Sequence, residues 1–153
     1  MRMSTRLSAA LLSLLLPACG GSSNTPAAPP PVTTPPTTMP NFSGTYVGLM
    51  DYNVQGQGVL RVVGRTTLTH SGSTISYTTL VITFTTGQTT SFVLGNATLS
   101  GGTATGTTSY QSTGCGLVNV ETVTRFGPPT INLTVELRAQ TCAPSRLVGE
   151  LNR

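Results

Sequence analysis

Short runs of β-branched residues, separated by turn signals at regular intervals, are the feature that most limits what this chain can fold into. Threonine is the commonest residue, with 29 copies, and β-branched side chains favour strands over helices. No stretch after residue 40 shows the period of an amphipathic helix. Residues that favour turns fall between the runs: Gln55–Gly58, Ser71–Gly72, Gly87–Gln88, Gly101–Gly102, Gly114, Gly127–Pro129 and Ala143–Pro144.

This pattern predicts an all-β domain with eight antiparallel strands in a single up-and-down meander. A meander that stays open leaves two unpaired edges, so we favour a small closed β-barrel. A β-sandwich of two sheets is the alternative. The expected strands cover residues 44–54, 58–69, 74–86, 89–99, 103–111, 117–126, 130–140 and 145–152.

The last long hairpin can be tested for register against hydrophobicity. If it is centred on the two prolines at 128–129, Phe126 faces Ile131 and one side of the hairpin is mainly apolar. The same register places Cys115 opposite Cys142. Directly opposed strand residues have the Cα separation that a disulfide needs. We therefore predict a Cys115–Cys142 disulfide that clamps the open end of this hairpin.

The middle hairpin carries a candidate partner surface. Centred on Gly87–Gln88, it places Thr83 opposite Phe92 and makes the strand at 74–86 apolar on both faces. The apolar residues of the second face either dock a partner or turn inward at a bulge near residues 78–79. The candidate patch consists of Val63, Leu80, Ile82, Phe84 and Val93.

The interior of the barrel is a second candidate site, because a barrel can hold a small ligand. The expected faces place hydroxyl-bearing side chains among apolar walls at one end. The alternative is that these side chains simply fill a small, solid barrel. The candidate ligand-lining residues are Tyr46, Tyr52, Tyr77, Thr66 and Thr79.

The N-terminal residues are typical of a secretory signal that ends at a cysteine. Two arginines precede an apolar run at 7–16, which is shorter than the roughly 20 residues of a transmembrane helix but suits a signal peptide. The stretch Leu16-Pro17-Ala18-Cys19 resembles the lipobox of bacterial lipoproteins. The resemblance implies that Cys19 becomes the first mature residue and carries acyl chains such as palmitate. An ordinary cleaved signal with a chance cysteine is the alternative.

This interpretation divides the chain into three parts. Residues 1–18 are the expected signal peptide, and residues 41–153 form the expected β-barrel domain. Residues 19–40 hold the lipidated cysteine and a Pro/Thr/Ser-rich linker that we expect to be disordered. The expected location is the bacterial cell envelope. Gly20 stands where an inner-membrane retention signal would have aspartate, which favours the outer membrane.

The start of the domain resembles another family. Gly44-Thr45-Tyr46 is similar to the Gly-x-Trp motif that opens lipocalin-like barrels, with Tyr in place of Trp. In that family an arginine from the final strand packs on the aromatic ring. The resemblance implies that Arg146 stacks on Tyr46.

The chemistry-bearing residues argue against an enzyme. The chain has no lysine, which excludes Schiff-base chemistry. His70 is the only histidine, and a catalytic triad would need a nucleophile and an acid beside it. Glu121 and Glu136 face each other in the expected register, as the carboxylates of a glycosidase do, but on the polar side of the hairpin. We therefore expect no catalytic residues.

Metal and nucleic-acid sites are not expected either. One histidine and a disulfide-bonded cysteine pair leave too few ligands for zinc. Residues 41–153 hold six arginines and four acidic residues without a cationic cluster, whereas nucleic-acid binding calls for clustered cations. We expect no cofactor, and partners limited to the membrane, through Cys19, and a protein or small apolar ligand.

The expected function is that of a lipid-anchored cell-envelope protein acting as a non-catalytic binding or structural interaction module. The alternative is a lipocalin-like carrier of a small apolar ligand in the barrel lumen. The two differ in one feature. A carrier needs an open lumen with tyrosines pointing in, whereas an interaction module needs the patch around Leu80, Ile82 and Phe84 to be exposed.

Overall fold

Every regular element in residues 40–153, the part of the chain that this computed structural model describes, is a β-strand. The signal peptide, the lipidation of Cys19 and the linker fall outside the described residues. The strands are β1 (Gly44–Val54), β2 (Gly58–Ser71), β3 (Thr74–Tyr77), β4 (Thr79–Thr83), β5 (Thr89–Val93), β6 (Asn96–Ser100), β7 (Thr103–Ser112), β8 (Gly116–Gly127), β9 (Thr130–Ala139) and β10 (Ser145–Asn152).

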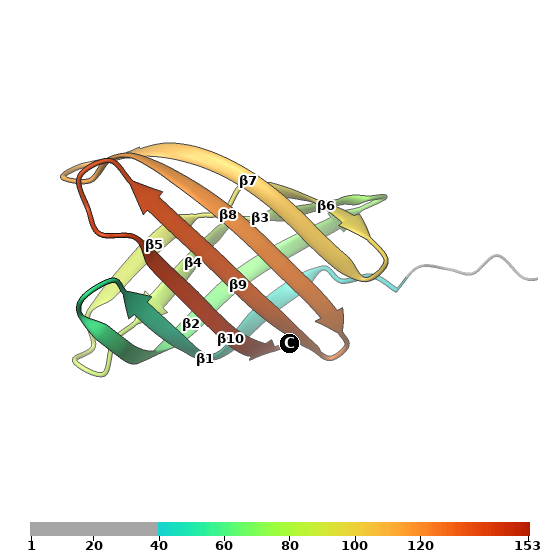
Figure 1. Ribbon diagram of the computed structural model, residues 1–153. Coiled ribbons are helices and arrows are strands. Elements are labelled where there is room, and N and C mark those ends of the chain that lie inside the picture. Colours follow the sequence, from blue (N-terminus) through green and yellow to red (C-terminus); the bar gives the residue numbers. More distant parts are fainter. Residues whose placement is uncertain (1–39) are drawn as a thin grey trace, which may run out of the picture. The chain divides into compact units, whose positions relative to one another are not determined.

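The strands form a closed antiparallel barrel, which confirms the expected fold and not the sandwich (Figure 1). Neighbours follow the order β1-β10-β9-β8-β7-β6-β3-β2, and pairing of β1 with β2 closes the ring. β4 and β5 lie outside this ring of eight strands. β4 pairs with β2, and β5 pairs with β4. The expected strands at 74–86 and 89–99 are therefore each divided into two.

A bulge at Thr78 divides the first of these strands. β2 pairs Leu68 with Tyr77 and Arg65 with Val81. Two residues of β2 thus lie opposite three residues of its neighbour. One extra residue in a strand is a β-bulge, which bends the strand and shifts which side chains face inward.

The bulge decides the outcome for the candidate patch. Leu80 and Ile82 turn into the barrel and are 0% exposed, and Phe84 is packed against the core. Only Val63 and Val93 stay on the outer surface, 42% and 39% exposed. The bulge alternative is confirmed, and the expectation of one exposed patch is wrong.

The register of the middle hairpin also differs from expectation. Phe92 lies opposite Leu80, not Thr83. The turn covers Phe84 to Gln88, where the Phe84 backbone N–H donates to the Gln88 carbonyl over 2.9 Å. The hairpin is therefore centred nearer to Phe84 than the glycine at 87 suggested, and β5 is displaced along β4.

The β8–β9 hairpin has the predicted register. Phe126 faces Ile131 and the pairing continues to the far end of the strands. The disulfide between Cys115 and Cys142 is present, with 5.1 Å between the Cα atoms. Pro128 and Pro129 form the tip, joined by a cis peptide bond. The prediction of a clamped hairpin is confirmed.

The middle of the barrel is filled with apolar side chains. Met50 of β1 is 1% exposed and lies against two glycines of the neighbouring strands. A Cβ at Gly149 would lie 2.6 Å from Met50 Cγ, and a Cβ at Gly64 would collide with the Met50 sulfur. Only glycine leaves room for this side chain. The largest fully buried side chains are Met50, Leu68, Ile75, Leu80, Ile82, Leu94, Ile131, Leu133, Leu147 and Leu151.

Candidate functional site

The two ends of the barrel differ, and the short segment directly before β1, which contains Phe42, closes one of them. Phe42 is 6% exposed, and its ring centre lies 4.2 Å from that of Phe126. The Tyr46 hydroxyl donates to the Phe42 carbonyl over 2.9 Å. Phe42 is therefore held over this end, which lies at the right of Figure 1.

His70 holds this segment in place. Its backbone N–H donates to Ser43 Oγ over 2.8 Å, and its Nδ1 lies 3.5 Å from the Phe42 backbone nitrogen. Its Nε2 lies 2.8 Å from the Gly72 carbonyl oxygen. One neutral tautomer, with the proton on Nε2, satisfies both ring contacts. The lone histidine thus has a positioning role.

The other end of the barrel is an open mouth. The loops that follow β1, β4, β7 and β9 gather there, at the left of Figure 1. The cavity there measures ≈ 610 Å³, within the range of about 300–1,000 Å³ that is typical of ligand pockets. Its lining residues lie between positions 52 and 145, and none of them is charged.

Aromatic side chains form part of the wall of the mouth. The ring centre of Tyr52 lies 6.1 Å from that of Phe84 and 6.2 Å from that of Phe92. Tyr110 lines the mouth as well. β1 and β7 are four strands apart in either direction around the ring, so Tyr52 and Tyr110 come from opposite walls.

The phenol groups of Tyr52 and Tyr110 give the mouth its capacity for hydrogen bonding. Burial raises the pKa of the Tyr110 phenol, and the nearby Tyr52 raises it further. Tyr110 therefore remains protonated at neutral pH and can donate a hydrogen bond. Each phenol can both donate and accept, which gives an apolar cavity two polar handles.

The disulfide fixes the rim of the mouth. Cys115 precedes β8, Cys142 precedes β10, and both line the cavity. Beside it, the Thr141 backbone N–H donates to the Cys115 carbonyl over 3.3 Å. The Thr141 hydroxyl donates to the Gly114 carbonyl over 3.0 Å. Two of the four rim loops are thus tied together.

The predicted ligand-lining residues fall in three places. Tyr52 lines the mouth. Tyr46, Tyr77 and Thr66 are buried in the filled interior, as the alternative of a solid barrel required. Thr79 is exposed on the outside, and its assignment to the lining is wrong because the bulge directly before it reverses the faces.

Tyr77 is an internal contact of the core. Its hydroxyl lies 2.5 Å from Thr124 Oγ1. Burial raises the pKa of Tyr77 to about 12, although the hydrogen bond from Thr124 acts in the opposite direction. This pair links β3 to β8 across the interior, with both hydroxyl groups satisfied.

The sequence analysis did not name Tyr110, Phe84 and Phe92 as lining residues, although it gave the inward turn of Phe84 as an alternative. A signal was present: residues 107–110 read Thr-Thr-Ser-Tyr and residues 89–92 read Thr-Thr-Ser-Phe. Each run ends in an aromatic residue near the same end of the barrel. The expected register of the middle hairpin hid this similarity, because it placed Phe92 opposite the wrong residue.

The predicted stacking of Arg146 on Tyr46 is wrong. Arg146 lies on the outer surface, where its Nε is 3.6 Å from Glu136 Oε1. Tyr46 points inward. The arginine that acts on it is Arg153, whose charge lowers the pKa of Tyr46 while the larger effect of burial raises it.

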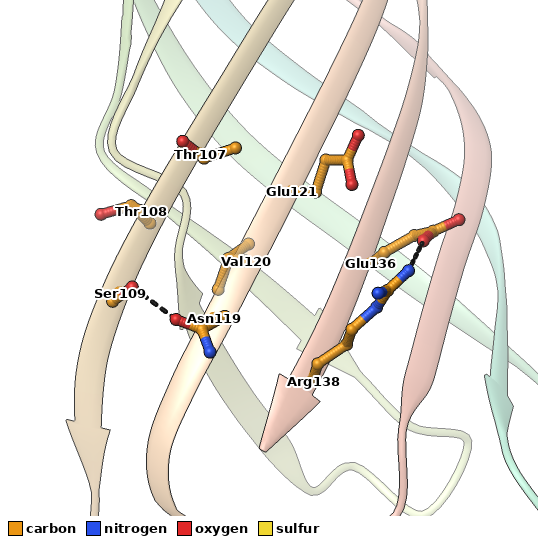
Figure 2. A pocket seen from close by; sticks show the side chains of 8 residues that line it. All are labelled: Thr107, Thr108, Ser109, Asn119, Val120, Glu121, Glu136 and Arg138. Carbon is orange, nitrogen blue, oxygen red and sulfur yellow. Dashed lines mark hydrogen bonds and ion pairs between the residues drawn. The ribbon is translucent and has the colours of Figure 1, made fainter. Parts of the chain in front are cut away.

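The paired glutamates lie on the outer face of β8 and β9 (Figure 2). Glu121 faces Glu136 as predicted, and Arg138 Nη2 lies 3.5 Å from Glu136 Oε2. A shallow hollow of ≈ 380 Å³ covers this surface. Exposed ion pairs of this kind contribute little to stability. The arrangement is that of a solvated sheet face.

Comparisons with known protein families, curated proteins and solved structures found no match. Among residues 40–153, no three His, Cys, Asp or Glu side chains gather closely enough to hold a metal ion. The same residues contain no helix long and apolar enough to cross a membrane. The mouth is therefore the site whose geometry carries the functional argument.

Proposed function

We propose that this protein is a non-catalytic binding protein of the bacterial cell envelope, anchored through Cys19, that holds an uncharged apolar ligand in the barrel mouth. The observation that carries the proposal is the uncharged, aromatic-lined cavity of ≈ 610 Å³. Ligand pockets typically measure about 300–1,000 Å³ and are mostly apolar, with a few polar groups.

The proposal favours the carrier over the interaction module. The module required an exposed patch around Leu80, Ile82 and Phe84, whereas Leu80 and Ile82 are fully buried. The carrier required an open lumen with tyrosines pointing in. Tyr52 and Tyr110 meet that requirement at the mouth. The lumen below is filled, so the ligand occupies only the mouth.

The lining determines the class of ligand. A carboxylate or phosphate in this cavity would lose water without meeting a cation, which is costly. The phenols of Tyr52 and Tyr110 offer hydrogen bonds to a hydroxyl or carbonyl group, and the rings of Phe84 and Phe92 offer stacking surface. The ligand is therefore a neutral, partly aromatic molecule with one or two polar groups.

Fluorescence titration with two dyes that share the anilinonaphthalene ring system tests the charge selection. N-phenyl-1-naphthylamine is neutral, and 8-anilinonaphthalene-1-sulfonate carries one negative charge. We expect the mature chain from residue 19 carrying Cys19→Ser, which has neither the apolar signal peptide nor an acyl chain to compete for the dye, to bind the neutral dye saturably. The anionic dye should bind at least about tenfold more weakly.

Tyr110→Ala tests the location. Removing this ring should weaken binding of the neutral dye by about tenfold, because an aromatic contact surface is lost. Thr107→Ala is the matched control, since Thr107 lies on the same strand and is exposed on the outer face. Absence of saturable binding, or equal losses in the two variants, would contradict the proposal.

A further inference from the structure

The lining of the mouth is arranged in two tiers along the strands. On β5, Phe92 is 9% exposed and Thr90 is exposed, and both line the cavity. On β7, Tyr110 and Ser112 line it in the same way. Side chains two positions apart in a strand share a face. Each strand therefore places a hydroxyl group beside an aromatic ring on the same inner wall.

The hydroxyl group of each pair lies nearer the opening. Thr90 is close to the start of β5, beside the turn that follows β4, and Ser112 is the last residue of β7. The loops that follow β4 and β7 both belong to the open end (Figure 1). Thr90 is therefore closer to that end than Phe92, and Ser112 is closer to it than Tyr110.

A third hydroxyl group at the rim comes from β10. Ser145 is the first residue of that strand, directly after the loop that follows β9. It is half-buried, pairs with Leu137 of β9 and lines the cavity. Three different strands thus supply hydroxyl groups at the opening. We call Thr90, Ser112 and Ser145 the rim hydroxyls.

The inner tier is apolar apart from the two phenol groups. Val118, Leu137 and Phe92 are 4%, 5% and 9% exposed, and Tyr52 and Tyr110 lie among them. Neither tier contains a charged residue. The cavity therefore changes with depth, from buried apolar and aromatic walls to neutral hydroxyl groups in contact with solvent.

A ligand that matches both tiers has two different ends. Its inner end is apolar, and an aromatic ring fits because it can pack against Phe84 and Phe92. Its outer end meets hydroxyl groups, each of which can donate and accept a hydrogen bond. A head with several hydroxyl groups can bond to more than one of them at once, and it brings no charge that needs a counter-charge.

We propose that the mouth selects a neutral aromatic compound with a hydroxyl-rich head, of which an aryl glycoside is the simplest example. The ring lies in the inner tier, and the head is hydrogen-bonded by the rim hydroxyls. This inference rests on the proposed function and adds to it the class of the head group and the orientation of the ligand.

Three naphthalene compounds with different heads test the role of the rim. They are 2-naphthyl β-D-glucopyranoside, 2-naphthol and 2-naphthyl sulfate, each competing with N-phenyl-1-naphthylamine for the mature chain from residue 19 carrying Cys19→Ser. We expect the glucoside to bind at least about tenfold more tightly than 2-naphthol, because its head adds two or three hydrogen bonds. The sulfate should bind no more tightly than 2-naphthol.

A double variant tests the location of the head. Ser112→Ala combined with Ser145→Ala removes two rim hydroxyls and leaves the aromatic tier unchanged. Its affinity for the glucoside should fall at least about fivefold, whereas its affinity for 2-naphthol should stay the same. Thr107→Ala, on the outer face of β7, is the control and should change neither affinity.

The outcomes separate this inference from the proposed function. Saturable dye binding with equal affinities for the glucoside and 2-naphthol overturns the inference alone. So does a sulfate that binds as tightly as the glucoside, or a double variant that keeps full affinity for the glucoside. A double variant that loses both ligands has lost its fold, and the ranking of the three compounds on the unaltered residues then decides. Absence of saturable dye binding overturns the inference and the proposed function together.

Discussion

Individual side chains differ between the filled interior of this barrel and its open mouth. Tyr77 and Thr124 satisfy each other inside, and Met50 fills a space that only glycines leave open. Tyr52 and Tyr110, by contrast, line the open cavity. Tyrosines of one chain thus take two roles, and the difference lies in whether the protein itself supplies the partner of the hydroxyl group.

Tyr77 makes the fold less stable at alkaline pH. Its pKa is raised to about 12 in the folded state, against about 10 in an unfolded chain. Below pH 10 the tyrosine is protonated in both states, and its contribution is fully present. Between pH 10 and 12 only the unfolded chain ionises, so stability falls by up to about 2.7 kcal/mol. Denaturant unfolding across this range should show the decline.

Tyr77→Phe provides the control for that dependence. The variant keeps the ring and loses the ionisable group, so the decline above pH 10 should become shallower. At neutral pH it should cost about 1 kcal/mol, because Thr124 Oγ1 loses its partner. An unchanged alkaline slope would mean that another group controls the transition.

At the scale of elements, the β8–β9 hairpin was predictable and the middle hairpin was not. One face of β8 and β9 is apolar and the other polar, so a slip by one residue would bury charges. The strand at residues 80–84 is apolar on both faces, and hydrophobicity therefore could not choose between registers. The bulge at Thr78 could be named as an alternative, but only the pairing of β2 with β3 and β4 decides it.

The same ambiguity explains what was missed in the candidate site. Tyr52 lies on β1, whose bounds were predicted correctly. The expected faces of that strand therefore also predicted that Tyr52 points inward. Phe84 and Phe92 lie in the hairpin whose register was wrong. β6 pairs with β7 but β5 does not, and the change near Gly95 has no turn signal in the sequence beyond the glycine itself.

The disulfide is the element-scale device that holds the mouth. It closes a loop with a sequence separation of 27 residues, and chain entropy for such a loop corresponds to about 3.5 kcal/mol of stability. Replacing both Cys115 and Cys142 with serine should lower the melting temperature measured by circular dichroism. The β8–β9 pairing itself should persist, because its register follows from the apolar face. An unchanged melting temperature would show that the bridge does not constrain the unfolded chain.

Residues 40–153 form a barrel with one sealed end, a filled middle and one open end. Phe42, positioned by His70 and Tyr46, covers the sealed end. The apolar core beneath the mouth limits a ligand to the rim region. The ion pairs lie on the outside, between β1 and β2 and on β9 and β10. Under the proposed function, contact with a neutral ligand belongs to the open end of the barrel.

Mapping of amide resonances by nuclear magnetic resonance tests this division most directly. Spectra of the mature chain from residue 19 carrying Cys19→Ser would be recorded with and without N-phenyl-1-naphthylamine. We expect shifts at the loops that follow β1, β4, β7 and β9, and none around Phe42 and Phe126 at the sealed end. Shifts centred on the exposed apolar residues Leu49 and Val63 of the outer surface, or no shifts at saturating dye, would contradict the account.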